Sequence, residues 1–195
     1  MDQLDPHQKN GQPWRTISVV AGSDLDELTP SWGVIFLDFD GVIRVAAEGG
    51  WIAADQAEFC QGRMKMLGEV CRDTGAKIVI SSDWRHLENL EEIKGYLSPY
   101  LTQYLHDDWN TPICGHRWNE VERWLRDHDE VTRYAILEDF APHFDGCDRE
   151  MQSRLVLCTN RYGLVPELAD RVTQLLERRL VFSADPQAHE RQIVT

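Results

Sequence analysis

Short apolar runs alternate with stretches of helical periodicity along most of the chain. Several of the runs are continuous rather than alternating, which is typical of strands that are buried on both faces of a sheet. Polar or acidic residues follow directly where these runs end. The predicted strands are 33–37, 76–80, 134–137 and 154–158, with weaker strand candidates at 16–20 and 100–105.

Apolar residues spaced three and four apart predict helices between the strands. The first of these helices stops at Gly75, and glycine is typical just beyond a helix C-terminus. Strands that alternate with helices favour an α/β fold, in which a mainly parallel sheet forms the middle of three layers. The predicted helices are 55–73, 86–95, 118–127 and 164–180, and residues 110–112 are expected to form a loop.

The length of 195 residues favours a single domain over residues 1–195. Within it we expect a leader at 1–13, a core over about 33–180 and a polar tail at 184–195. No stretch approaches the roughly 20 apolar residues that a membrane-spanning helix needs. The first residues also lack the basic and apolar regions of a secretory signal. We therefore expect no membrane association.

The net charge of −13 disfavours extended binding of nucleic acid, because contacts to phosphate supply most of the affinity of such surfaces. Action on a nucleic-acid end through a local basic pocket remains compatible with this charge. The cysteines form no CxxC pair and are odd in number, which indicates reduced thiols and a cytoplasmic location. They are Cys60, Cys71, Cys114, Cys147 and Cys158. The oligomeric state stays open.

The most informative feature is the acidic pair Asp38 and Asp40, which follows the apolar run 34–37. Residues two apart in an extended chain lie on the same side, and Gly41 then breaks the strand. Like charges this close are unfavourable without a compensating cation, so the pair predicts a divalent-metal site. A calcium-binding EF-hand loop also opens with two spaced aspartates, but it needs glycine at position six and glutamate at position twelve. Here glycine is fourth and position twelve is Gly49, which excludes that loop.

Three predicted strands end in polar or acidic pairs. In open α/β sheets, the ligand site lies outside the carboxyl ends of the strands, so parallel strands would bring these pairs together. Carboxylates and hydroxyls suit Mg²⁺, whereas the lack of histidines and cysteines at ligand spacing argues against zinc. The converging pairs are Asp38 with Asp40, Ser81 with Ser82, and Glu138 with Asp139.

The segment 37–43, with the sequence LDFDGVI, resembles motif I of the haloacid dehalogenase (HAD) superfamily of phosphohydrolases. Residues 78–81 resemble its motif II, a strand ending in serine or threonine, and 134–139 resemble motif IV, a strand ending in paired acids. More narrowly, the chain resembles the HAD domains of Swiss Army knife RNA-repair proteins over about 33–180. The residues that carry this narrower likeness are 80–85, Arg117, Glu120, Val121, Trp124, Leu125, Leu155, Val156, Gly163 and Leu164.

This resemblance implies a role for each residue. Asp38 would be the nucleophile that forms an aspartyl-phosphate, and Asp40 would be the general acid and base. Mg²⁺ would be held by Asp38, the carbonyl of Asp40 and the motif IV acids Glu138 and Asp139. The residues expected to bind phosphate are Ser81, Ser82, Arg117, Arg85 and Gly41.

Two positions depart from the family pattern. Arg117 stands where the family usually has a lysine, and a guanidinium can grip phosphate with two parallel hydrogen bonds. Glu138 and Asp139 replace the commoner pair of aspartates, which makes Asp139 the stronger ligand candidate. Asp145 is the alternative if the more widely spaced version of motif IV applies.

About 40 residues separate motifs I and II, and about 35 separate motif II from Arg117, so we expect a minimal cap or none. An open site of this kind admits large substrates. The leading hypothesis is a Mg²⁺-dependent phosphomonoester hydrolase, with a polynucleotide end as the favoured substrate. A phosphorylated metabolite or nucleotide is the alternative substrate. A non-catalytic HAD-fold binding or regulatory module is the alternative from a different functional class.

Overall fold

The computed structural model describes residues 16–18, 32–45, 58–177 and 181–183, and a parallel five-stranded sheet forms its centre. The strand order is β6-β5-β2-β7-β8, with β2 in the middle and every pairing parallel. The prediction of an α/β fold with a mainly parallel sheet is therefore confirmed. The strands are β2 (Val34–Leu37), β5 (Lys77–Ile80), β6 (Leu105–Asn110), β7 (Tyr134–Glu138) and β8 (Leu155–Leu157).

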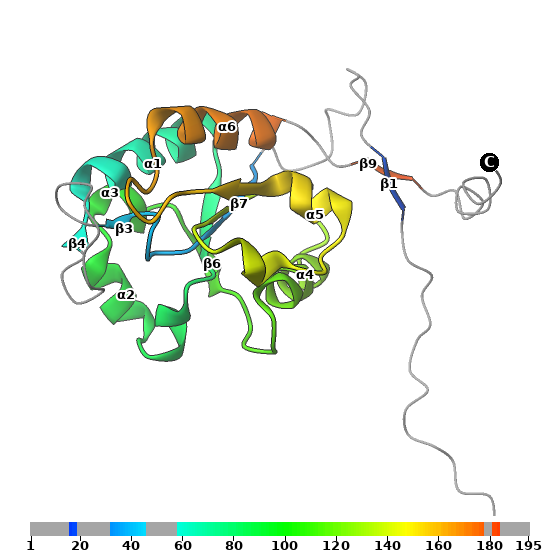
Figure 1. Cartoon of the computed structure of the whole chain (residues 1–195), viewed down its shortest axis with the longest axis horizontal. Coiled ribbons are helices and arrows are strands. Elements are labelled where there is room, and N and C mark those ends of the chain that lie inside the picture. The colour runs from blue at the N-terminus through cyan, green and yellow to red at the C-terminus, as the bar shows by residue number, and fades with distance from the viewer. Residues whose placement is uncertain (1–15, 19–31, 46–57, 178–180, 184–195) are drawn as a thin grey trace, which may run out of the picture.

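Helices cover both faces of this sheet. On one face, α1 (Gln61–Thr74) and α6 (Pro166–Glu177) lie side by side (Figure 1). On the other, α4 (Arg117–Asp127) and α5 (Arg149–Arg154) contribute to the apolar packing. The result is the three-layer arrangement that the alternating pattern predicts.

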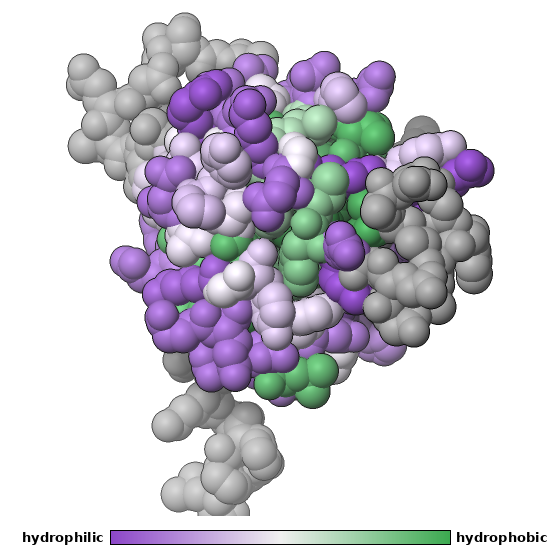
Figure 2. All heavy atoms as spheres, turned by 90° about the vertical axis from the view of Figure 1, so that its left-hand side faces the viewer, coloured by the Kyte–Doolittle hydropathy of each residue, from purple (hydrophilic) through white to green (hydrophobic). Residues whose placement is uncertain are grey.

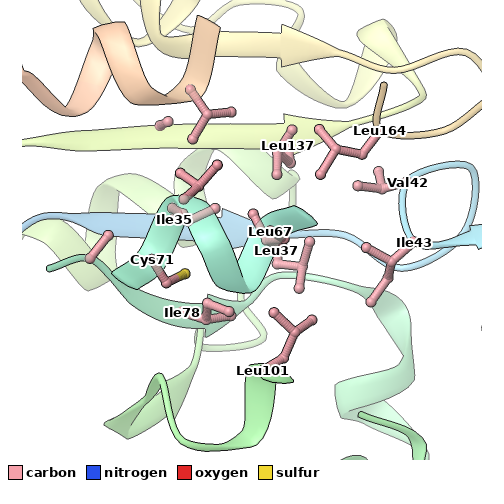
Figure 3. Packing of buried hydrophobic residues seen from close by; sticks show 14 of the residues in the cluster. Ile35, Leu37, Val42, Ile43, Leu67, Cys71, Ile78, Leu101, Leu137 and Leu164 are labelled. Atoms are coloured by element: carbon pink, nitrogen blue, oxygen red, sulfur yellow. The ribbon is translucent and has the colours of Figure 1, made fainter. Parts of the chain in front are cut away.

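The middle strand β2 supplies side chains to both apolar layers. Ile35 and Leu37 belong to the cluster that includes α1 and α6, and Figure 3 shows them packed among its members. Val34 and Phe36 belong to the cluster on the side of α4 and α5. Because both faces are buried, the strand has a continuous apolar run in place of alternation.

The predicted helix 55–73 begins later than expected, at Gln61. Glu58 and Phe59 form strand β4 (Glu58–Phe59), which pairs antiparallel with β3 (Arg44–Val45). Residues 55–57 lie outside the described part of the chain. Figure 2 looks at the side of the molecule that carries these short strands, where apolar surface is framed by polar residues.

The predicted strand 100–105 is wrong. The chain forms a single helical turn there, α3 (Pro99–Thr102), because Ser98 and Pro99 are a helix start and proline is well suited to the first helical position. The strand follows as β6, which also takes Asn110 from the predicted loop 110–112. This strand lies at the edge of the sheet. It is polar and partly exposed, so it lacks the continuous apolar run that marks the buried strands.

The predicted helix 86–95 is two elements. A 3₁₀ turn, η2 (Asp83–His86), follows β5. The helix α2 (Leu90–Tyr96) comes next, and the side chain of Asn89 caps its N-terminus together with Glu92. The remaining helices lie close to their predicted positions. The short 3₁₀ turn η3 (Ala141–Phe144) and α5 were not predicted.

A separate two-stranded antiparallel sheet joins β1 (Thr16–Ser18) to β9 (Val181–Ser183). The predicted leader at 1–13 and tail at 184–195 lie outside the described residues, so the single-domain organisation stays a prediction. Across the described ranges, every helix is too short or too polar to cross a membrane.

Candidate active site

The carboxyl ends of β2, β5 and β7 lie level with one another. The backbone N–H of Ser81 donates to the carbonyl of Leu37 at 3.0 Å, and the N–H of Asp38 donates to the carbonyl of Leu137 at 3.0 Å. These two bonds continue the parallel pairing one residue beyond the strands. The structure thereby brings Asp38, Ser81 and Glu138 to one edge of the sheet.

A tight turn follows Asp38. The carbonyl of Phe39 accepts hydrogen bonds from the backbone N–H groups of Val42, Ile43 and Arg44, at 2.8–3.2 Å. Gly41 has a φ of +67°, and a Cβ atom built on it would lie 2.1 Å from Oδ2 of Asp139. Only glycine therefore fits this turn while Asp139 lies against it.

Three carboxyl groups meet at this edge, those of Asp38, Glu138 and Asp139. One oxygen of each lies within 4.8 Å of the other two. Burial raises the pKa of Glu138, and the neighbouring Asp38 raises it further. The same two causes raise the pKa of Asp139 to about 6. A divalent cation would relieve the repulsion, and this set of carboxylate oxygens fits Mg²⁺.

Arg117 reaches the acidic cluster from the first turn of α4. Its side chain is buried, with Nη1 3.5 Å from Oδ1 of Asp38 and 3.7 Å from Oε2 of Glu138. Nη2 donates to Oδ1 of Asp83 at 2.8 Å. The predicted cation thus lies beside the predicted nucleophile, inside a buried site where its charge is poorly screened.

Several buried polar atoms of the site have no hydrogen-bond partner among the described residues. They are Oγ of Ser81, Nη1 of Arg117, Oε2 of Glu138 and Nδ1 of His143. Buried polar groups are normally hydrogen-bonded, so a group of unsatisfied atoms at one edge of the sheet indicates that a polar ligand belongs there.

The structure gives Arg85 a different environment from the one predicted. Its buried guanidinium donates to the carbonyls of Ser81, Ser82 and Thr111, and to the carboxylate of Glu120. These contacts tie the end of β5 to α4. Ser82 is also buried and directly precedes η2, and its carbonyl accepts one of these hydrogen bonds from Arg85.

Asp40 stands apart from the acidic cluster. Its side chain is half exposed, and its carboxylate accepts hydrogen bonds from Nη1 of Arg44 at 2.5 Å and from Nε1 of Trp84 at 2.8 Å. The other predicted acid outside the cluster, Asp145, is exposed after η3. The sequence contains no spacing signal that pairs Trp84 or Arg44 with Asp40.

His143 is a further neighbour that the sequence does not reveal. Its Nδ1 lies 3.3 Å from Oε2 of Glu138, without hydrogen-bond geometry. Burial and the nearby charge of Arg117 lower the pKa of its imidazole. Because η3 was not predicted, the sequence did not indicate that His143 lies beside the carboxylate of Glu138.

A parallel α/β sheet with carboxylates and a serine at its strand ends, and an arginine of α4 beside them, defines a Rossmann-like domain with its candidate site at the carboxyl edge of the sheet. Over residues 34–169 the chain matches the HAD domain in Swiss Army Knife RNA repair proteins. The match covers more than half of the chain, which therefore belongs to this HAD family, and this confirms the resemblance seen in the sequence. Comparisons with curated proteins and with solved structures gave no match. Family membership indicates a HAD-type phosphohydrolase.

Proposed function

We propose that this protein is a Mg²⁺-dependent phosphomonoester hydrolase that works through an aspartyl-phosphate on Asp38. One observation carries the proposal: Ser81 Oγ and Arg117 Nη1 are buried at the strand edge that holds Asp38, and neither makes a hydrogen bond to a described residue. A phosphoryl group attacked by Asp38 would accept hydrogen bonds from both. Charge-assisted bonds from a guanidinium are the stronger kind.

The two aspartates divide the chemistry. An oxygen of Asp38 attacks phosphorus, and the bond from phosphorus to the leaving oxygen breaks while Asp40 gives that oxygen a proton. Asp40 then takes a proton from the water that attacks the aspartyl-phosphate. This releases inorganic phosphate and restores Asp38 as a carboxylate. Asp40 is exposed enough to meet both the leaving group and water.

Mg²⁺ would be held by carboxylate oxygens of Asp38, Glu138 and Asp139, together with the main-chain carbonyl of Asp40. It would supply positive charge that neutralises the phosphoryl oxygens. The raised pKa values of Glu138 and Asp139, and the unsatisfied Oε2 of Glu138, support this assignment.

A polynucleotide end is the substrate that we favour. The family is described from RNA-repair proteins. The described residues between β2 and α1 form only the short strands β3 and β4, and none of these residues builds a cap domain. A phosphorylated metabolite or nucleotide is the competing substrate, because a net charge of −13 repels a polyanion.

The substitution Asp38→Asn tests the proposal, because an amide oxygen is a far weaker nucleophile than a carboxylate. We expect Mg²⁺-dependent hydrolysis of an aryl phosphate to fall by about 10⁴-fold or more. Asp107→Asn is the matched control, since Asp107 is exposed on the edge strand β6. A screen with 5′- and 3′-phosphorylated oligonucleotides, nucleotides and sugar phosphates would identify the substrate.

Binding of fluoroberyllate, which mimics a phosphoryl group on aspartate, separates an enzyme from a binding module. Wild-type protein should bind it only with Mg²⁺, and Asp38→Asn should not bind it. Wild-type protein that binds neither Mg²⁺ nor fluoroberyllate, and hydrolyses no phosphate ester in the screen, would be a non-catalytic module.

A further inference from the structure

Asp40, Arg44 and Trp84 form a closed group in which each side chain contacts the other two. Arg44 Nη1 binds one oxygen of the Asp40 carboxylate, and Trp84 Nε1 binds the other. The guanidinium carbon of Arg44 lies 5.2 Å from the centre of the Trp84 ring. Asp40 comes from the turn after β2 and Arg44 from β3, whereas Trp84 comes from η2, 44 residues from Asp40 in the sequence.

Aromatic packing fixes the indole of Trp84. The centre of its ring system lies 6.2 Å from that of Phe39, 5.5 Å from that of Phe59 and 5.0 Å from that of Tyr96. The rings of Phe59 and Tyr96 also stack on each other at 5.4 Å. Rings at these separations restrict one another, so the direction of the indole N–H is set by the cluster.

The geometry points to Trp84 and Arg44 as positioning residues for acid–base catalysis by Asp40. Without these two donors, a half-exposed carboxylate two residues from Asp38 would be free to turn toward a cation bound at the acidic cluster. The two donors hold it outside that cluster, which contains Asp38, Glu138 and Asp139. Each oxygen keeps a second lone pair, so a proton can still pass between Asp40 and the leaving oxygen. This inference rests on the proposed phosphohydrolase function.

Trp84→Phe is the test, because phenylalanine keeps an aromatic ring in the cluster and removes the N–H donor. We expect kcat to fall by about tenfold for alkyl phosphates, the effect of losing one hydrogen bond. The loss should be smaller for aryl phosphates with acidic leaving groups, which need less help from a proton donor. A plot of log(kcat/KM) against leaving-group pKa should therefore be steeper than for wild type. Asp40→Asn should give the steepest plot.

Tyr100→Leu is the matched control. It removes an exposed aromatic ring of α3 that is not one of the rings packed on Trp84. It should leave the slope of the plot near that of wild type. Fluoroberyllate binding should be unchanged in Trp84→Phe, since the group around Asp38 is untouched.

An equal loss of kcat for all leaving groups in Trp84→Phe would overturn the inference, because it would indicate a general structural defect. If that variant does not fold, Arg44→Gln provides the same slope measurement through the other donor, with the same outcomes. The proposed function fails separately, when wild type has no activity that Asp38→Asn abolishes, and the inference then falls with it.

Discussion

At the residue scale, two aspartates of the same turn receive opposite environments. Asp38 is buried and faces Arg117, whereas Asp40 is half exposed and is bound by Arg44 and Trp84. Identical side chains gain different chemistry from their neighbours, since burial and charge decide whether a carboxylate attacks, binds a cation or transfers a proton.

The acidic cluster predicts that stabilisation by Mg²⁺ depends on pH. The pKa of Asp139 is raised from 3.8 to about 6, so the unfolded chain loses this proton first. In the metal-free protein, the stabilising contribution of this carboxyl group is therefore lost as pH rises from about 4 through about 6. Mg²⁺ binds the ionised carboxylates, so the increase in Tm that it causes should be larger at pH 8 than at pH 5.

At about 100 times its Kd, Mg²⁺ adds roughly 2.7 kcal/mol, which corresponds to a rise of about 5–10 °C for a chain of this size. Thermal unfolding followed by circular dichroism at both pH values measures this. Asp139→Asn should lose most of the rise at pH 8, and Asp145→Asn should keep it because Asp145 lies outside the cluster. An equal rise at both pH values would mean that these carboxyl groups do not bind the ion.

At the element scale, the site depends on short connections that join the strands to α4. Arg85 in η2 and Glu120 in α4 form a buried ion pair, and Arg85 also holds the carbonyls at the end of β5. Arg117, one turn before Glu120, is thereby carried to Asp38. The sequence places Arg85 next to motif II, and the structure shows its guanidinium bound to main-chain carbonyls and to Glu120.

The turn after β2 predicts a severe effect of Gly41→Ala. The methyl group would meet Asp139 at 2.1 Å, and a left-handed conformation costs alanine about 1–2 kcal/mol. Since a displacement of about 1 Å can cost 100-fold in rate, kcat/KM should fall by at least about 100-fold. Steady-state kinetics and thermal unfolding measure the two effects.

Gly95→Ala is the control for that substitution. Gly95 lies in α2, and a Cβ atom there would meet nothing within 4 Å. Alanine should stabilise the helix by up to about 1 kcal/mol and leave activity unchanged. If Gly41→Ala behaves like Gly95→Ala, Asp139 is not needed where the structure places it.

At the scale of the whole molecule, the net charge of the protein opposes binding of the polynucleotide end that we propose as substrate. A net charge of −13 slows the approach of a polyanion, and salt screens that repulsion. For a 5′-phosphorylated oligonucleotide, kcat/KM should therefore rise severalfold between about 20 and 200 mM salt. A mononucleotide should show a smaller change. A steep fall for the oligonucleotide would instead indicate a basic groove, because counterion release weakens such binding in salt.

Most of the sheet could be predicted because buried parallel strands are continuous apolar runs, as in β2, β5 and β7. The errors fall where local signals compete. Pro99 starts a helical turn that overlaps the predicted strand 100–105. The edge strand β6 is polar and lacks the continuous apolar run of the central strands. The short turns η2 and η3 follow no periodicity, so His143 could not be placed beside Glu138.

By itself, the sequence determined the α/β class, the order of the motifs and the likeness to the HAD family, since these depend on local periodicity and residue type. Only the tertiary structure decided which groups meet. In the structure Arg85 binds Glu120, Asp145 lies outside the acidic cluster, and Trp84 donates a hydrogen bond to Asp40. Side-chain direction depends on contacts between residues far apart in the chain, and no local pattern encodes these.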